Sequence, residues 1–206
     1  MATIGFIKRR FRSYKKKLKT SLGLKDPLRE LEIEKERELY HPERLVLLEY
    51  CMSGKGIDVG CGNRKTHDNC IGVDIIPNGS LGNAGCIAGK EIVSDICASG
   101  DNLFMFKDQE LDFVISRHNL EHYVDVIKTL NEWKRILKVG GIMAVVLPNE
   151  SAINTIALDP THKHAFPPES FLKYIELIGG FTIVKVEDVI PNWSFICVLR
   201  KLGNSV

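Results

Sequence analysis

Short apolar segments alternate with helical ones from residue 56 onward. Runs rich in β-branched residues predict five strands before residue 150, over 56–60, 70–75, 91–96, 111–116 and 142–147. Apolar positions spaced three and four apart predict a helix over 124–138, closed by Gly140 and Gly141. The same spacing predicts a helix over 169–178. Such alternation is typical of a parallel sheet with helices on both faces.

The chain ends in two strands that are predicted to run in opposite directions. Residues 181–189 and 193–201 are both apolar and β-branched, and only a short turn at Pro191 and Asn192 separates them. The predicted fold is therefore α/β, with a mainly parallel sheet and one reversed strand in a C-terminal hairpin. The glycine-rich stretch 78–90 is predicted to be a surface loop.

The first 25 residues differ from the rest of the chain in charge. They contain nine of the 28 Lys and Arg residues and no acidic residue, whereas the whole chain has a net charge of only +2. Within 4–22, apolar residues recur at helical spacing among the basic ones, as in a helix that lies on an anionic membrane surface. A solvated basic arm fits the same pattern. Specific binding to nucleic acid is a weaker alternative, because no base-reading element is visible.

Length and composition divide the chain into three parts. We predict a basic amphipathic arm over 1–25, a helical lead-in over 26–53 whose second helix opens at Pro42, and one main domain over 54–206. The six cysteines show no C-x-x-C spacing, which argues against a zinc knuckle or a disulfide framework. Neither a membrane span nor a signal peptide is visible. We expect a cytoplasmic protein, with the arm offering a contact to the inner face of the membrane.

The stretch 56-GIDVGCGNRK-65 is the first candidate for a ligand site. Gly60 and Gly62 follow a short apolar strand, where the chain turns sharply and small residues let the backbone approach a ligand closely. The third glycine of a dinucleotide loop is replaced by Lys65, and no Walker-type phosphate loop occurs. The motif therefore favours a nucleoside ligand without a phosphate, such as S-adenosylmethionine.

Polar residues follow several predicted strands at the edge where a parallel sheet binds its ligands. Acids close the first three of these strands, namely Asp58, Asp74 and Asp95, and Ser116, Arg117 and His118 close the fourth. Each acid also suits a helix cap or a turn. The repetition favours a shared site, and a carboxylate at the end of the second strand is suited to accept both hydroxyls of a ribose.

These motifs, taken in order, resemble the class I S-adenosylmethionine-dependent methyltransferases, in particular the type 11 group. The resemblance covers about residues 54–200 and rests on 58-DVGCG-62, 73-VDI-75, 93-VSD-95, 112-DFVISRHNLEH-122 and 133-WKRILKVGG-141. It implies a Rossmann-like sheet of seven strands whose last hairpin carries the reversed strand. Only 12 positions separate Gly62 from Asp74, so we expect the first crossover helix to be short or irregular.

The resemblance also implies cofactor contacts, all to S-adenosylmethionine. Asp58 and the loop of Gly60, Cys61, Gly62 and Asn63 are expected beside the methionine portion. Asp74 is expected at the ribose, Asp95 and Ile96 at the adenine, and Ser116, Arg117 and His118 near the sulfonium, with Ile75 as a further cofactor contact.

Two pairs of histidines are candidates for acid–base chemistry. His118 and His122 follow the fourth strand, and His162 and His164 lie on the long connection after the fifth. A histidine is the natural base for removing a hydroxyl proton near neutral pH. We name His118, His164 and His122 as catalytic candidates, with His122 also suited to bracing the loop. His118 and His122 are four positions apart with Glu121 beside them, which superficially resembles a metal site. The usual Glu after the first histidine is absent and a third ligand is not evident in the sequence, so we assign no metal.

These features predict a methyltransferase that modifies a small-molecule or glycan acceptor, with oxygen favoured as the reacting atom, in a setting such as surface-polysaccharide assembly. A quinone-like or natural-product hydroxyl is an alternative acceptor. An alternative of another class is a non-catalytic module of the same fold that binds a partner. The sequence leaves the acceptor and the oligomeric state open.

Overall fold

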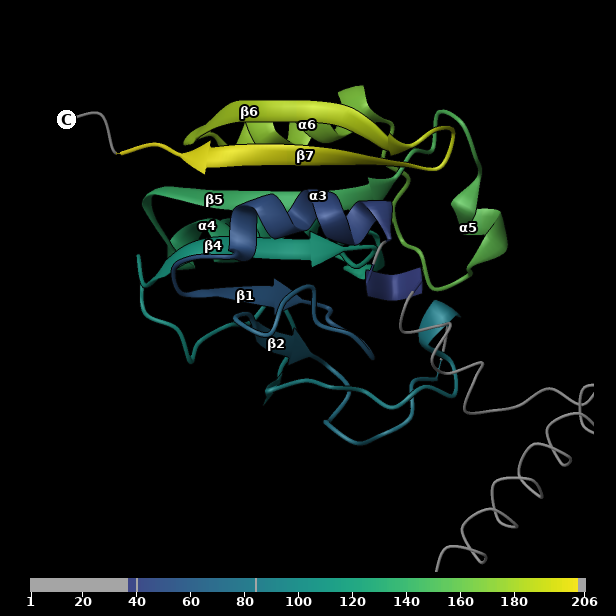
Figure 1. Cartoon of the computed structure of the whole chain (residues 1–206). Coiled ribbons are helices and arrows are strands. Elements are labelled where there is room, and N and C mark those ends of the chain that lie inside the picture. Colours follow the sequence, from purple (N-terminus) through teal and green to yellow (C-terminus); the bar gives the residue numbers. More distant parts are fainter. Residues whose placement is uncertain (1–36, 40, 84, 204–206) are drawn as a thin grey trace, which may run out of the picture. The chain divides into compact units, whose positions relative to one another are not determined.

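The computed structural model describes residues 37–39, 41–83 and 85–203. The predicted arm at 4–22 lies outside these residues. From Pro42 onward the chain forms one compact unit. Its centre is a seven-stranded sheet in the order β3-β2-β1-β4-β5-β7-β6 (Figure 1).

The sheet is parallel except at one strand. Its strands are β1 (Gly56–Val59), β2 (Ile71–Asp74), β3 (Ile96–Cys97), β4 (Leu111–Arg117), β5 (Leu137–Pro148), β6 (Phe181–Ile190) and β7 (Ser194–Lys201). β7 pairs antiparallel with both β5 and β6, whereas the other neighbours pair in parallel. The predicted seven-stranded sheet with one reversed strand is confirmed.

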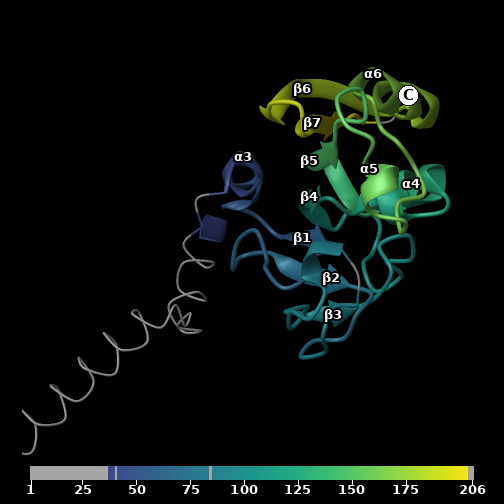
Figure 2. The same ribbon diagram turned by 90° about the vertical axis from the view of Figure 1, so that its right-hand side faces the viewer.

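Helices cover both faces of the sheet, as predicted. The helical segments are α3 (Pro42–Cys51), η1 (Gly85–Ile87), η2 (Leu120–His122), α4 (Val126–Ile136), α5 (Thr155–Leu158) and α6 (Pro168–Ile178). Figure 2 shows α3 on one side of the sheet and α4 and α6 on the other. α3 lies within the predicted lead-in and packs against the sheet.

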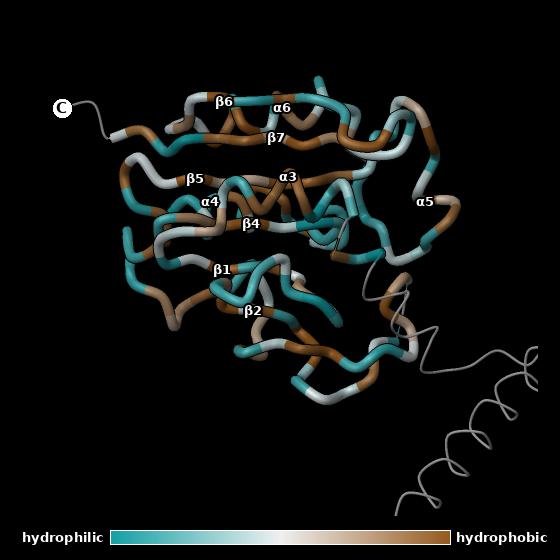
Figure 3. Tube along the Cα trace, viewed as in Figure 1, coloured by the Kyte–Doolittle hydropathy of each residue, from teal (hydrophilic) through white to brown (hydrophobic). Residues whose placement is uncertain are grey.

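Two hydrophobic cores hold these layers together, and apolar residues line the central strands (Figure 3). The larger core includes Trp133 of α4 and Phe171 of α6, both fully buried. The smaller core joins Leu47 and Cys51 of α3 to the opposite face of β4, β5 and β7. The alternation of side chains along each strand divides apolar residues between the two cores.

Two local predictions are wrong. The predicted strand over 91–96 is reduced to Ile96 and Cys97, because the amide of Ile92 donates to Ser80 and that of Val93 to Gly62. These amides are used by loops and not by a neighbouring strand. Gly140 and Gly141 do not close the preceding helix, which ends at Ile136; they lie inside β5.

The connections between the first strands contain little helix. Among the described residues, 60–70 and 98–110 form no helix, and the link from β2 to β3 contains only η1. The expected short or irregular first crossover is confirmed. The stretch 78–90 is mainly an exposed loop, as predicted.

The smaller core depends on α3, which gives a first prediction. Replacing the fully buried Leu47 by Ala should lower the free energy of unfolding by about 2–5 kcal/mol, because the cavity cannot close completely. Leu45 of the same helix is 43% exposed, and its replacement by Ala should cost less than about 0.5 kcal/mol. Urea denaturation of the two variants measures the difference; equal losses would show that α3 does not form this core.

Candidate functional site

The loop after β1 adopts a conformation that requires glycine. Gly60 and Gly62 have φ angles of 72° and 58°, in the left-handed region. The amides of Gly60 and Cys61 donate to the carbonyl of Val73 at 2.8 and 3.3 Å, so the loop folds back over the end of β2. A Cβ atom at Gly60 would lie 2.2 Å from Cγ of Asn119. The glycine thus allows the residues that follow β4 to contact this loop.

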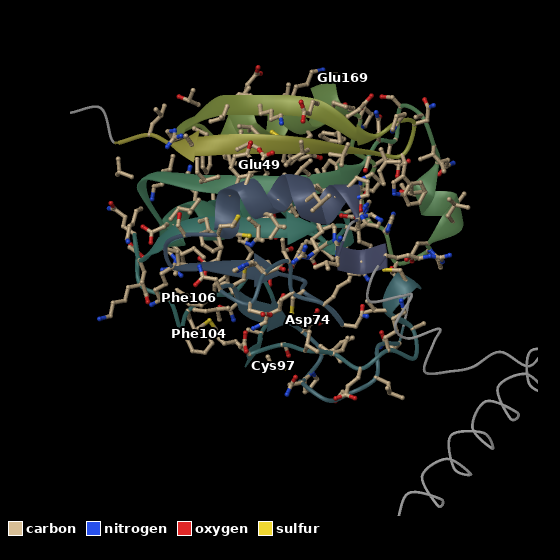
Figure 4. The ribbon with its side chains drawn as sticks, viewed as in Figure 1. Glu49, Asp74, Cys97, Phe104, Phe106 and Glu169 are labelled. Carbon is tan, nitrogen blue, oxygen red and sulfur yellow. The ribbon has the colours of Figure 1, made fainter. Side chains whose placement is uncertain are left out.

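Two buried aspartates hold the glycine loop in place. Asp58 accepts a hydrogen bond of 2.6 Å from the amide of Thr66, and burial raises the pKa of its carboxyl group. Asp74 accepts from the amides of Gly62 and Ile76, both at 2.9 Å. Figure 4 labels Asp74 at the end of β2, beside Cys97 at the end of β3. The carboxyl edge of the sheet therefore combines a close backbone turn with a buried acid.

The carboxylate of Asp95 is occupied by hydrogen bonds from within the protein. It accepts hydrogen bonds from Nζ of Lys65 at 2.9 Å and from the amide of Gly72 at 2.7 Å. Burial opposes its ionisation, but these bonds keep the pKa of Asp95 below its usual value. Ile96 packs against the larger core, whereas the side chain of Ile75 is exposed. Contact of Asp95 and Ile96 with an adenine remains a prediction.

The other predicted cofactor residues lie around the same edge. The hydroxyl of Ser116 donates to the carbonyl of Val59 at 2.9 Å and ties β4 to β1. Arg117 is buried, as is Cys61, whose thiol pKa is raised by burial. Asn63 accepts a hydrogen bond from the neighbouring Arg64.

His118 is held between two acids. Its Nε2 lies 2.9 Å from Oε1 of Glu43, in the first turn of α3, and its Nδ1 lies 3.6 Å from Oε1 of Glu121. Burial favours the neutral ring, but the carboxylates of Glu121 and Glu43 outweigh it and raise the pKa of His118 to about 9. Its φ of 49° turns the chain sharply after β4. Both ring nitrogens are therefore directed at carboxylates.

Three other histidines, His122, His162 and His164, lie in one region after β4. Nδ1 of His122 lies 3.1 Å from the hydroxyl of Thr161, and the rings of His122 and His162 contact edge to face, with centroids 4.7 Å apart. His164 stacks on Phe166, and its Nε2 donates to the carbonyl of Val124 at 3.2 Å. His118, the other catalytic candidate, instead faces Glu43 and Glu121.

The loop 78–90 approaches both the glycine loop after β1 and the loop that carries His162 and His164. A Cβ atom at Gly62 would lie 3.0 Å from Cγ2 of Ile87, and one at Gly85 would lie 2.9 Å from Oδ2 of Asp159. The loop therefore contacts the glycine loop at one point and the histidine-bearing loop at another. Sequence patterns predicted its exposure and not this position.

Comparisons with known proteins agree with this geometry. A methyltransferase-domain family profile matches residues 54–145. The solved structure of a SAM-dependent methyltransferase from Archaeoglobus fulgidus matches with a TM-score of 0.56 at 17% identity, over 83% of this chain and 99% of that one. The chain belongs to the class I S-adenosylmethionine-dependent methyltransferases.

Two further matches cover most of this methyltransferase-family chain. An uncharacterised protein of Methanocaldococcus jannaschii is 30% identical over 162 residues, which are 74% of this chain and 76% of the relative. The 1,6-didemethyltoxoflavin-N1-methyltransferase of Burkholderia thailandensis, solved with S-adenosylhomocysteine, matches with a TM-score of 0.59 at 12% identity, over 93% of this chain and 90% of that one. At such identities the solved structures are evidence for the fold. No helix among the described residues has the length and apolar character needed to cross a membrane.

Several residues of this methyltransferase edge were missed by sequence reasoning. Asn119 faces Gly60, and its amide donates to the hydroxyl of Tyr123 at 3.1 Å. That hydroxyl also accepts from the amide of Gly100. The spacing of Asn119 and Tyr123 placed them near His118, but only the fold brings them to the glycine loop. Glu43 gave no sequence signal, because its partner is 75 positions away.

The contact of Gly60 with Asn119 gives the second prediction. Gly60→Ala should lower the free energy of unfolding by more than the ~1–2 kcal/mol expected for a left-handed alanine, because Cβ would also collide with Asn119. Gly89 has a similar φ of 73° and no atom within 4 Å of its Cβ position, so Gly89→Ala isolates the backbone cost. Thermal unfolding compares the variants, and equal shifts would contradict the close approach.

Proposed function

We propose that this protein binds S-adenosylmethionine at the glycine loop and transfers its methyl group to an oxygen of a small-molecule or glycan acceptor. The observation that carries the proposal is the position of Asp74. It is 7% exposed, ends β2, and accepts hydrogen bonds from the amides of Gly62 and Ile76. A carboxylate has about four lone-pair positions, so about two remain for the vicinal hydroxyls of a ribose.

The fold supports this choice of cofactor in two ways. In open α/β sheets the ligand lies beyond the carboxyl ends of the strands, where Gly60, Gly62 and Asp74 are found. In addition, the Burkholderia methyltransferase of similar fold was solved with S-adenosylhomocysteine. When bound, S-adenosylmethionine supplies an electrophilic methyl carbon to the acceptor oxygen and leaves as S-adenosylhomocysteine.

His164 is the residue that we assign to the acceptor proton. Its Nε2–H donates to the carbonyl of Val124, which leaves Nδ1 with a lone pair. Nδ1 takes the hydroxyl proton as the oxygen attacks. His118 is less suited to this step, because both of its ring nitrogens face carboxylates. We assign it to joining α3 to the segment after β4.

Two alternative functions can be distinguished by experiment, namely methylation of a different acceptor and cofactor binding without catalysis. A quinone-like or natural-product hydroxyl would use the same cofactor residues, and incubation with methyl-labelled S-adenosylmethionine separates it from a glycan by the mass of the labelled product. A non-catalytic module would bind the cofactor without releasing S-adenosylhomocysteine in the presence of any acceptor fraction.

The third prediction concerns cofactor affinity. Asp74→Ala should weaken S-adenosylmethionine binding by about 1–3 kcal/mol, because the ribose hydroxyls lose a charged acceptor. The exposed Asp68 on the preceding loop is the matched control, and Asp68→Ala should leave affinity unchanged. Isothermal titration calorimetry with S-adenosylmethionine, S-adenosylhomocysteine and NAD measures these affinities; a folded wild-type protein that binds none of the first two would rule out the proposal.

The fourth prediction concerns the base. His164→Gln should reduce kcat by about 10²–10⁴-fold, while the affinity for S-adenosylmethionine and the thermal stability stay near wild type. Release of S-adenosylhomocysteine with the acceptor identified by labelling gives the rate. A wild-type kcat in His164→Gln would remove this residue from the mechanism, and a parallel loss of stability would assign it a structural role.

A further inference from the structure

Glu121, His122 and His162 form a cluster that the sequence does not reveal. One ligand atom of each lies within 4.8 Å of those of the other two, and Nε2 of His162 lies 3.9 Å from Oε1 of Glu121. Glu121 and His122 belong to η2, whereas His162 comes from the loop after α5, which lies at the carboxyl end of the sheet (Figure 1). The fold thus brings His162, a residue of a type that can bind a metal, beside Glu121 and His122.

The carboxylate of Glu121 is buried without a hydrogen bond. Its residue is 0% exposed, and neither of its oxygens has a hydrogen-bond partner. Nδ1 of His118 lies 3.6 Å from Oε1 of Glu121, beyond hydrogen-bond distance. The ring of His118 offsets part of this charge, but it also serves Glu43, so a buried carboxylate without a hydrogen bond calls for a further partner such as a bound ion.

Hydroxyl groups fix the orientation of the two histidines. Thr155 donates its single hydroxyl proton to Glu150, so at the 2.9 Å contact it accepts from Nδ1–H of His162. This leaves Nε2 of His162, the nitrogen nearer Glu121, with a lone pair.

The same arrangement occurs at His122. Thr161 donates to Oδ1 of Asp159 at 2.6 Å, so it accepts from Nδ1–H of His122 at 3.1 Å. Nε2 of His122 is then also unprotonated. In metal sites, a hydrogen bond from the non-ligating ring nitrogen fixes the ring and its tautomer in this way.

A cluster that contains only acceptor atoms suits a cation better than a water molecule. A carboxylate and two unprotonated imidazole nitrogens are all acceptors, and a single water has only two protons to donate. We propose that Glu121, His122 and His162 bind a divalent transition-metal ion. Two imidazoles and one carboxylate suit Zn²⁺ and its neighbours in the first transition series better than Mg²⁺, which prefers oxygen ligands.

Binding requires only a small contraction of the cluster. Metal–ligand distances of about 2.0–2.2 Å place tetrahedral ligands roughly 3.3–3.5 Å apart, compared with separations of up to 4.8 Å in the cluster. The exposed fraction of the His162 side chain is 10%, so little solvent must be displaced. Three protein ligands leave a coordination position open, as in metal sites that bind a substrate oxygen.

The position of the cluster suggests where that oxygen would come from. Asn119, whose side chain meets Gly60, directly precedes η2, so the cluster follows the segment that contacts the glycine loop. Coordination of an acceptor hydroxyl by the ion rests on the proposed methyl transfer. The metal site itself does not.

The test is a metal titration of the full-length chain without a histidine tag and without S-adenosylmethionine. After treatment with a chelator, wild-type protein should bind one Co²⁺ or Zn²⁺ per chain, and Co²⁺ should give visible d–d absorption bands. Glu121→Gln and His162→Gln should each weaken binding by at least about tenfold, because each removes one of three ligands. Because no cofactor is present, failure of the methyl-transfer proposal would leave this result unaffected.

A matched control lies two positions from a proposed ligand. His164→Gln should retain wild-type metal affinity, because this residue is outside the cluster. Far-ultraviolet circular dichroism in the absence of metal checks that Glu121→Gln and His162→Gln are folded. The proposal is wrong if wild-type protein binds neither ion stoichiometrically, if the two folded ligand variants keep wild-type affinity, or if His164→Gln loses as much affinity as they do.

Discussion

The need to compensate buried negative charge shapes the carboxyl edge of this sheet. Four acids there are almost completely buried: Glu43, Asp58, Asp74 and Glu121. A buried carboxylate is tolerated only when amides, a cation or another partner replace its lost hydration. Backbone amides serve Asp58 and Asp74, and His118 serves Glu43. The first two acids thereby fix the glycine loop, and Glu43 fixes the turn after β4.

The same constraint explains how the glycine loop keeps its shape without a crossover helix. In a dinucleotide loop a third glycine lets a helix pack closely against the strand, and the helix N-terminus then faces the ligand. Here residues 60–70 form no helix, so no close helix packing limits the side chain at Lys65. Lys65 instead pairs with Asp95, which also accepts from the amide of Gly72. The departure from the usual glycine pattern and the missing helix therefore agree with each other.

The sequence predicted those features that arise from local periodicity. The long apolar runs identified β4, β5 and the C-terminal hairpin, and helical spacing identified α4 and α6. It failed at β3, where loop carbonyls take up the amides of Ile92 and Val93. Loop hydrogen bonds of this kind leave no periodic signal. Its placement of Asp58 and Asp74 at strand ends was informative, but the pattern did not show that Asp58 braces Thr66.

Contacts between distant segments were the main features that the sequence could not predict. Glu43 lies 75 positions from His118, and Thr161 lies 39 positions from His122. No spacing rule relates such residues, because helix packing and a long loop bring them together. The sequence assigned no metal because no third ligand was evident near His118 and His122, and that assignment stays a prediction. The loop after α5 brings His162 to Glu121 and His122, a contact that no sequence spacing indicates.

The turn from His118 to His122 connects the parts of the site mechanically. The left-handed conformation of His118, with a φ of 49°, turns the chain into η2, and Nδ1 of His118 lies 3.6 Å from Oε1 of Glu121. The intervening residues point elsewhere: Asn119 meets Gly60, and Leu120 is buried in the larger core. Leu120 in the core and Asn119 at the glycine loop therefore anchor the same short turn. A ligand that draws Glu121 toward His162 would act on the turn that also contacts the glycine loop.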